Sequence, residues 1–303
     1  MKKSAALITV LTVVAGIIAA VLRRIECNTI FNDEGLAERG APISIILIIF
    51  CVLFAAVVVG FTVSKTGNRT VTGRYESVFH TETPAMLVIS AVLGAAMIAA
   101  GYLNYRTAAV GGTRAIVEGA VGLLAALAGV AFFALSFNAK RGKGGCMLAS
   151  LLVTIFVCFY ILVTYKKNAA DPVLLDNMYV FLALCFSALA SYYVAGFAFD
   201  RAAVKKTMTM SFISAFLCII ACVDRFGEWS MVFFIFLAVY LLAHGFLLTA
   251  ALGPEGRKDA PADAPAELSE EAELLKEFEA SADAAPDEAP ELSEELSGEE
   301  KDE

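Results

Sequence analysis

The chain has 303 residues, of which 59% are hydrophobic and only 18% are charged, and its mean hydropathy is +0.73. A typical soluble domain is about 45–50% apolar and about 25% charged, so this chain has more apolar surface than a soluble core can bury. The composition predicts an all-α polytopic membrane protein in contact with a lipid bilayer, and it excludes an extracellular disulfide scaffold and a basic nucleic-acid binder.

Eight segments are long and apolar enough to be transmembrane helices, each of which needs about 20 residues. The first could be a signal peptide, but its apolar run is long and Arg23 and Arg24 follow it, so we expect a retained helix. The Met-Lys-Lys start and the short loops are typical of a bacterial protein. In chain order the segments are Ser4–Leu22, Ile43–Val63, Pro84–Leu103, Ala115–Phe137, Cys146–Tyr165, Asp176–Phe199, Thr207–Val223 and Ser230–Leu252.

The orientation follows from the basic residues that flank these segments. With the N-terminus inside, 13 Lys and Arg residues fall on the inner side and eight on the outer side. Because cytoplasmic loops carry the excess of Lys and Arg, both termini are predicted to be cytoplasmic in a multi-pass protein of the cell (cytoplasmic) membrane.

Weak internal similarity suggests a duplication. Residues 86–93 and 210–217 agree at five of eight positions, and Gly60 and Gly196 close two corresponding segments. The predicted halves, 1–137 and 146–253, each hold four helices, so they would be parallel repeats related by an axis along the membrane normal. Chance is the alternative, because apolar segments use few residue types.

Polar groups within the spans are few. Ionisable residues in a bilayer are functional candidates by default, and they include Glu118, with Arg114 as its expected partner, and Asp176. A candidate substrate cavity is lined by four side chains: Ser211, Ser214, His244 and Tyr192. Packing against neighbouring helices is the simpler interpretation of all four, and of the small residues Gly94, Gly101, Gly119, Gly122 and Gly129.

The predicted cytoplasmic loop Ser64–Thr83 carries Lys65, Arg69 and Arg74. These cations could contact a phosphate, but anionic lipid headgroups are the simpler ligand, because the Gly-Lys-Ser/Thr ending of a P-loop is missing. Catalytic motifs and metal-ligand spacings are also missing, so we expect neither an enzyme nor a cofactor or metal site.

The C-terminal tail differs sharply from the rest of the chain. Residues 254–303 hold 19 acidic and four basic residues, whereas residues 1–253, the predicted transmembrane domain, carry a net charge of +7. Such a composition predicts disorder. Within it, the apolar face of a helix over Glu267–Ser281, formed by Leu268, Leu275 and Phe278, could dock a cytoplasmic protein partner; a fully solvated tail is the alternative.

Two functions remain open from the sequence. The duplication favours a small-molecule permease or substrate-binding membrane subunit, because transporters commonly carry internal repeats. The sparse polarity of the spans favours a non-catalytic scaffold or regulatory subunit that recruits a cytoplasmic partner through its acidic tail.

Overall fold

The computed structural model describes residues 2–29, 42–66, 75–80, 84–109, 114–141, 146–168, 177–224 and 229–252. Within these ranges the chain is helical, and eight helices are long and apolar enough to span a membrane, which confirms the predicted fold class. The helices are α1 (Lys2–Thr29), α2 (Pro42–Thr66), α3 (Tyr75–Val78), α4 (Ala85–Ala109), α5 (Arg114–Arg141), α6 (Cys146–Asn168), α7 (Met178–Gly196) with the 3₁₀ turn η1 (Phe197–Phe199), α8 (Val204–Ala221) and α9 (Ser230–Ala251).

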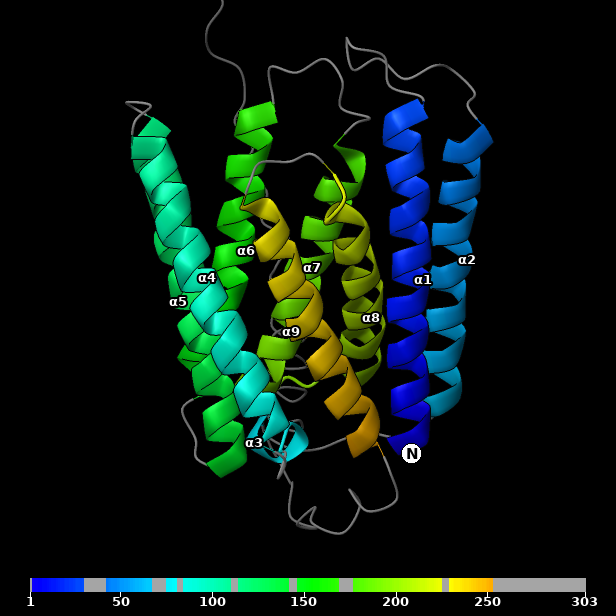
Figure 1. Ribbon diagram of the computed structural model, residues 1–303. Coiled ribbons are helices and arrows are strands. Elements are labelled where there is room, and N and C mark those ends of the chain that lie inside the picture. The colour runs from blue at the N-terminus through cyan, green and yellow to red at the C-terminus, as the bar shows by residue number, and fades with distance from the viewer. Residues whose placement is uncertain are drawn as a thin grey trace, which may run out of the picture. The chain divides into compact units, whose positions relative to one another are not determined.

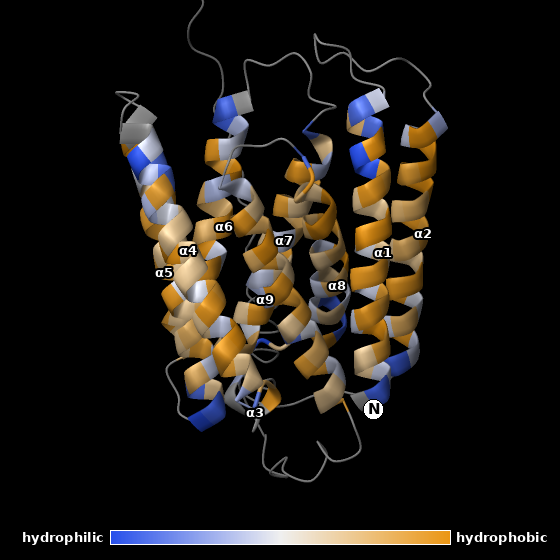
Figure 2. Ribbon diagram, viewed as in Figure 1, coloured by the Kyte–Doolittle hydropathy of each residue, from blue (hydrophilic) through white to orange (hydrophobic). Residues whose placement is uncertain are grey.

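The long helices form a bundle in which α7, α8 and α9 lie between two hairpins, α1–α2 and α4–α5 (Figure 1). The helix α8 packs against α7, α9, α1 and α2, so 72% of its apolar window is buried, whereas α2 buries only 17%. Hydrophobic residues cover the middle of the helices and hydrophilic residues gather at their ends (Figure 2). The chain is therefore an integral membrane protein whose outer helices face lipid.

Glycine allows α4 and α5 to approach closely. Gly94 lies opposite Gly129, and Gly101 lies opposite Gly122. A Cβ added at Gly94 would lie 2.8 Å from the carbonyl oxygen of Gly129, so no larger residue fits without moving a helix backbone. Small residues are the usual interface material between helices in a bilayer, and the packing interpretation of these glycines is confirmed.

The two halves of the predicted duplication are packed differently. In the predicted repeat, α2 corresponds to α7 and α4 corresponds to α8. In the second half α7 packs along α8, whereas in the first half α2 packs against α1 and α8, and α4 packs against α5 and α9. Gly60 faces open space, but a Cβ at Gly196 would lie 2.8 Å from the carbonyl oxygen of Arg201. Corresponding pairs do pack in both halves, α1–α2 with α6–α7 and α4–α5 with α8–α9, and the difference lies in the α7–α8 contact. The duplication stays a prediction from sequence.

Candidate functional site

The structure separates the four residues of the predicted cavity. Tyr192 is 61% exposed on the outside of α7, whereas Ser211, Ser214 and His244 are buried. The hydroxyl oxygen of Ser214 lies 2.7 Å from that of Ser187, which holds α8 against α7. Because α8 is the central helix, its polar stripe is enclosed by neighbouring helices. Ser211 and Ser214 are thus packed between helices, His244 borders a small space beside α3, and Tyr192 lies outside the bundle core; the larger cavity described below is lined by none of the four.

His244 is held by a short segment that the sequence assigned to a loop. Its Nε2 atom lies 2.6 Å from the hydroxyl oxygen of Tyr75 in α3, and its Nδ1 atom lies 2.7 Å from the carbonyl oxygen of Tyr240. Because a carbonyl oxygen only accepts, Nδ1 donates, and in the neutral ring Nε2 accepts from Tyr75. The ring of Phe79 lies against the imidazole, 5.0 Å between centroids. His244 therefore fastens α3 to α9.

This contact corrects part of the prediction for the loop 64–83. Tyr75, Val78 and Phe79 are buried in the end of the bundle, so this part of the segment does not lie free at the headgroups. Lys65 is half-buried at the end of α2. Arg69 and Arg74 lie outside the described residues, as does the tail with Leu268, Leu275 and Phe278.

A cavity of about 260 Å³ lies among α4, α5, α6 and α9, at the bundle end opposite the N-terminus of α1. We call it the α4–α9 cavity. Its apolar wall comes from Val121, Val163 and Phe233. Its polar side chains all lie near helix ends, where the antiparallel packing brings the last turns of α4 and α6 beside the first turns of α5 and α9: Asn104, Thr107, Glu118, Tyr160, Thr164, Lys167 and Ser230.

Glu118 and Lys167 are the charged groups of this lining. The Asn104 amide donates to the Glu118 carboxylate at 3.1 Å and to the Glu118 backbone carbonyl at 3.2 Å, which fixes the acid in place. The Lys167 ammonium lies 3.7 Å from the same carboxylate. The side chain of Lys167 is 58% exposed and that of Glu118 is 22% exposed. Among the described side chains, Lys167 is the cation beside Glu118; the side chain of Arg114, the expected partner, lies outside the described residues.

Aromatic residues complete the cavity. The Tyr160 hydroxyl donates to Ser230 Oγ at 3.1 Å, which joins α6 to α9. Trp229, which directly precedes α9, is the only tryptophan of the chain. Its indole nitrogen is buried and has no hydrogen-bond partner among the described residues. Trp229 also lines the cavity.

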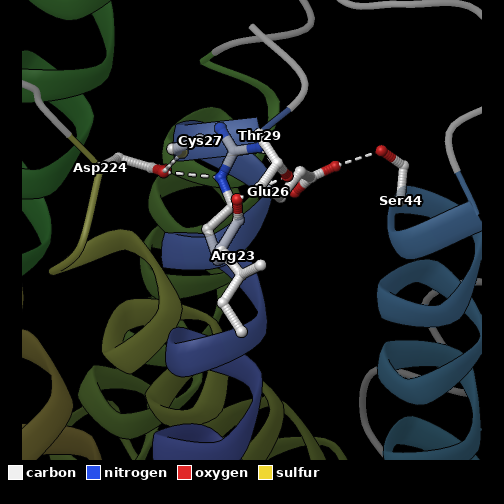
Figure 3. Close-up of polar contacts among 7 residues, drawn as sticks. Arg23, Glu26, Cys27, Thr29, Ser44 and Asp224 are labelled. Atoms are coloured by element: carbon white, nitrogen blue, oxygen red, sulfur yellow. Dashed lines mark hydrogen bonds and ion pairs between the residues drawn. The ribbon is translucent and has the colours of Figure 1, made fainter.

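A second charged cluster was missed by the sequence prediction. The first span was expected to end at Leu22, but α1 continues to Thr29 and carries Arg23 into the bundle, where it is 1% exposed. Arg23 Nε donates to Asp224 at 2.7 Å, and Nη1 donates to Glu26 at 2.9 Å (Figure 3). The Ser44 hydroxyl donates to Glu26 at 2.5 Å. The cluster therefore ties α1 to α2 and to the end of α8.

The signal for this cluster was partly visible in the sequence. Arg23 and Glu26 are three residues apart, the spacing at which side chains meet on one helix face, and this spacing would have indicated a helix that continues past Leu22. Asp224 could not be paired with them, because 201 residues separate it from Arg23.

No protein-family model, curated protein or solved structure matches this chain. The function of the chain is therefore inferred from its own residues.

The α4–α9 cavity can bind and orient a small molecule. It offers an ammonium, a carboxylate, several hydroxyls and an apolar wall, the mixture that ligand sites between bundle helices usually present. Its 260 Å³ corresponds to about nine water molecules at ~30 Å³ each. The cavity is partly open, so this volume indicates the size of the part of a ligand that it can enclose.

Proposed function

We propose that this chain is a small-molecule permease or substrate-binding membrane subunit, and that its ligand binds in the α4–α9 cavity. The observation that carries the proposal is the joint presence of Glu118, Lys167 and an apolar wall around one cavity at a membrane face. Sites of this kind are commonly built in the core of helix bundles. The role of the chain is binding and positioning, without catalysis.

The excess of basic residues on the side of the N-terminus supports a cavity that opens outwards. Lys166→Cys lies at the cavity end of α6 and Lys140→Cys lies at the opposite end of α5, and both positions are exposed. In cells, a membrane-impermeant thiol reagent should label the first variant and not the second, in a background without the native cysteines. Labelling of Lys140→Cys alone would place the cavity on the cytoplasmic side and refute the proposed orientation.

Trp229 provides a direct test of ligand binding. The full chain is purified into lipid nanodiscs and titrated with small polar molecules while tryptophan fluorescence is recorded. A ligand of the cavity should change the emission saturably, because Trp229 lines the site. In a control variant, Trp229→Phe with Tyr192→Trp, the tryptophan lies on the exposed side of α7, and the same ligand should leave its emission unchanged. Absence of any saturable change, or equal changes in both proteins, would refute the proposal.

A non-catalytic scaffold is the second candidate. It is favoured by the buried hydroxyls of Ser187 in α7 and Ser214 in α8, which bond to each other and so serve helix packing instead of a ligand. In this alternative the acidic tail recruits a cytoplasmic protein. Pull-downs from membranes with and without residues 254–303 test it: a tail-dependent partner should be lost in a variant carrying Leu275→Glu and Phe278→Glu. Identical captures with and without the tail would exclude recruitment.

A further inference from the structure

We infer that the ligand of the α4–α9 cavity is a small zwitterion with an apolar side chain, of the size and charge pattern of a neutral amino acid. The inference rests on the proposed function and specifies its substrate class. Three features of the cavity carry it. The cavity has one negative and one positive side chain, the negative one is held more rigidly than the positive one, and the small volume has an apolar wall.

The charges of the described lining residues balance. Glu118 and Lys167 contribute one negative and one positive charge, and their charged atoms are 3.7 Å apart. A ligand with a single charge would pair with one of them and bring a like charge near the other, which is unfavourable in a partly dehydrated site. A zwitterion places its ammonium against Glu118 and its carboxylate against Lys167, so both groups of the cavity keep a partner.

The Glu118–Lys167 pair is suited to opening. Its separation of 3.7 Å exceeds hydrogen-bond distance, and Lys167 is a long, mostly exposed side chain. Ion pairs with one solvent-exposed partner contribute little to stability, so a ligand that inserts between the two charges loses little. The two hydrogen bonds from Asn104 keep Glu118 in position during this exchange. Glu118 is therefore the fixed anchor for the ligand ammonium, and Lys167 closes on the ligand carboxylate.

Size and polarity restrict the remainder of the ligand. Val121, Val163 and Phe233 form the apolar wall, which favours an aliphatic group over a second polar one. A cavity of about 260 Å³ is closer in size to an amino acid than to a whole phospholipid, oligopeptide or nucleotide. The ring of Tyr160, 5.4 Å from that of Phe233 between centroids, adds an aromatic face toward which an ammonium is attracted.

Matched probes separate the contributions of the two charges. Alanine, valine and threonine are titrated into the nanodisc protein, each beside its amide, which lacks the carboxylate, and the corresponding carboxylic acid, which lacks the ammonium. Fluorescence of Trp229 and titration calorimetry give the affinities. At least one zwitterion should bind about tenfold or more tightly than both of its single-charge analogues, because each loses one charge-assisted hydrogen bond.

Three variants locate the charges. In Lys167→Met the zwitterion should bind no more tightly than its amide, and in Glu118→Gln no more tightly than the corresponding acid. The control Lys166→Met removes a neighbouring exposed ammonium that does not line the cavity, and it should keep the affinities of the unsubstituted protein.

The outcomes distinguish this inference from the proposed function. Saturable binding of a cation, an anion or an uncharged molecule in preference to every zwitterion would overturn the inference and leave the binding function intact. Equal effects of Lys167→Met and Lys166→Met would also overturn it. If no molecule of any charge class binds, both the inference and the proposed function fail.

Discussion

Replacing Arg23 by Met tests the buried charge cluster most sharply. The variant keeps a long side chain but leaves Glu26 and Asp224, each nearly inaccessible to solvent, without the guanidinium that contacts them at 2.9 and 2.7 Å. Removing one partner of a buried ion pair costs about 3–5 kcal/mol, because the remaining charge stays desolvated. Total stabilities are commonly about 5–15 kcal/mol, so we expect a large loss of the free energy of unfolding.

The neighbouring arginine provides the matched control. Arg24 is exposed on the next position of α1, and Arg24→Met should change the free energy of unfolding by no more than about 0.5 kcal/mol. Both variants are unfolded reversibly in mixed detergent micelles and followed by helical circular dichroism. The double variant Arg23→Met, Asp224→Asn should recover about 1 kcal/mol or more relative to Arg23→Met, because it removes the buried negative charge that faced the guanidinium. Equal losses in Arg23→Met and Arg24→Met would refute the reasoning.

Three further predictions use the same unfolding assay. Gly122→Val should cost about 1–3 kcal/mol because its side chain meets the α4 backbone, whereas Gly60→Val, which points into open space, should not destabilise the protein; equal effects would contradict the close approach. Tyr75→Phe should cost about 1–3 kcal/mol, since it leaves buried Nε2 of His244 without its donor, and an unchanged stability would mean that α3 is held by packing alone. Deleting residues 254–303 should leave the stability of the bundle within error, because so acidic a segment has little apolar surface to bury, and a large loss would show that the tail packs onto the helices.

The sequence by itself determined the spans and the close helix pair. A bilayer requires about 20 apolar residues per helix, so the spans are visible as runs of fixed length. The glycines of α4 and α5 identified a close interface because they occur on both members of one short-looped hairpin, whose helices must be antiparallel neighbours.

Only the tertiary structure decided which polar residues meet. Arg23 on α1 meets Asp224 at the end of α8, 201 residues later, and no local pattern pairs them. Glu118 and Lys167 lie on the consecutive helices α5 and α6, but which of the neighbouring Lys166 and Lys167 faces the acid depends on how these helices pack. A helical pattern shows which residues share a face of one helix, but the helix on the other side of that face is chosen by packing of the whole bundle. Ser211 and Ser214 lie on the central helix α8, where neighbouring helices enclose them, whereas the α4–α9 cavity forms where the ends of α4, α5, α6 and α9 come together.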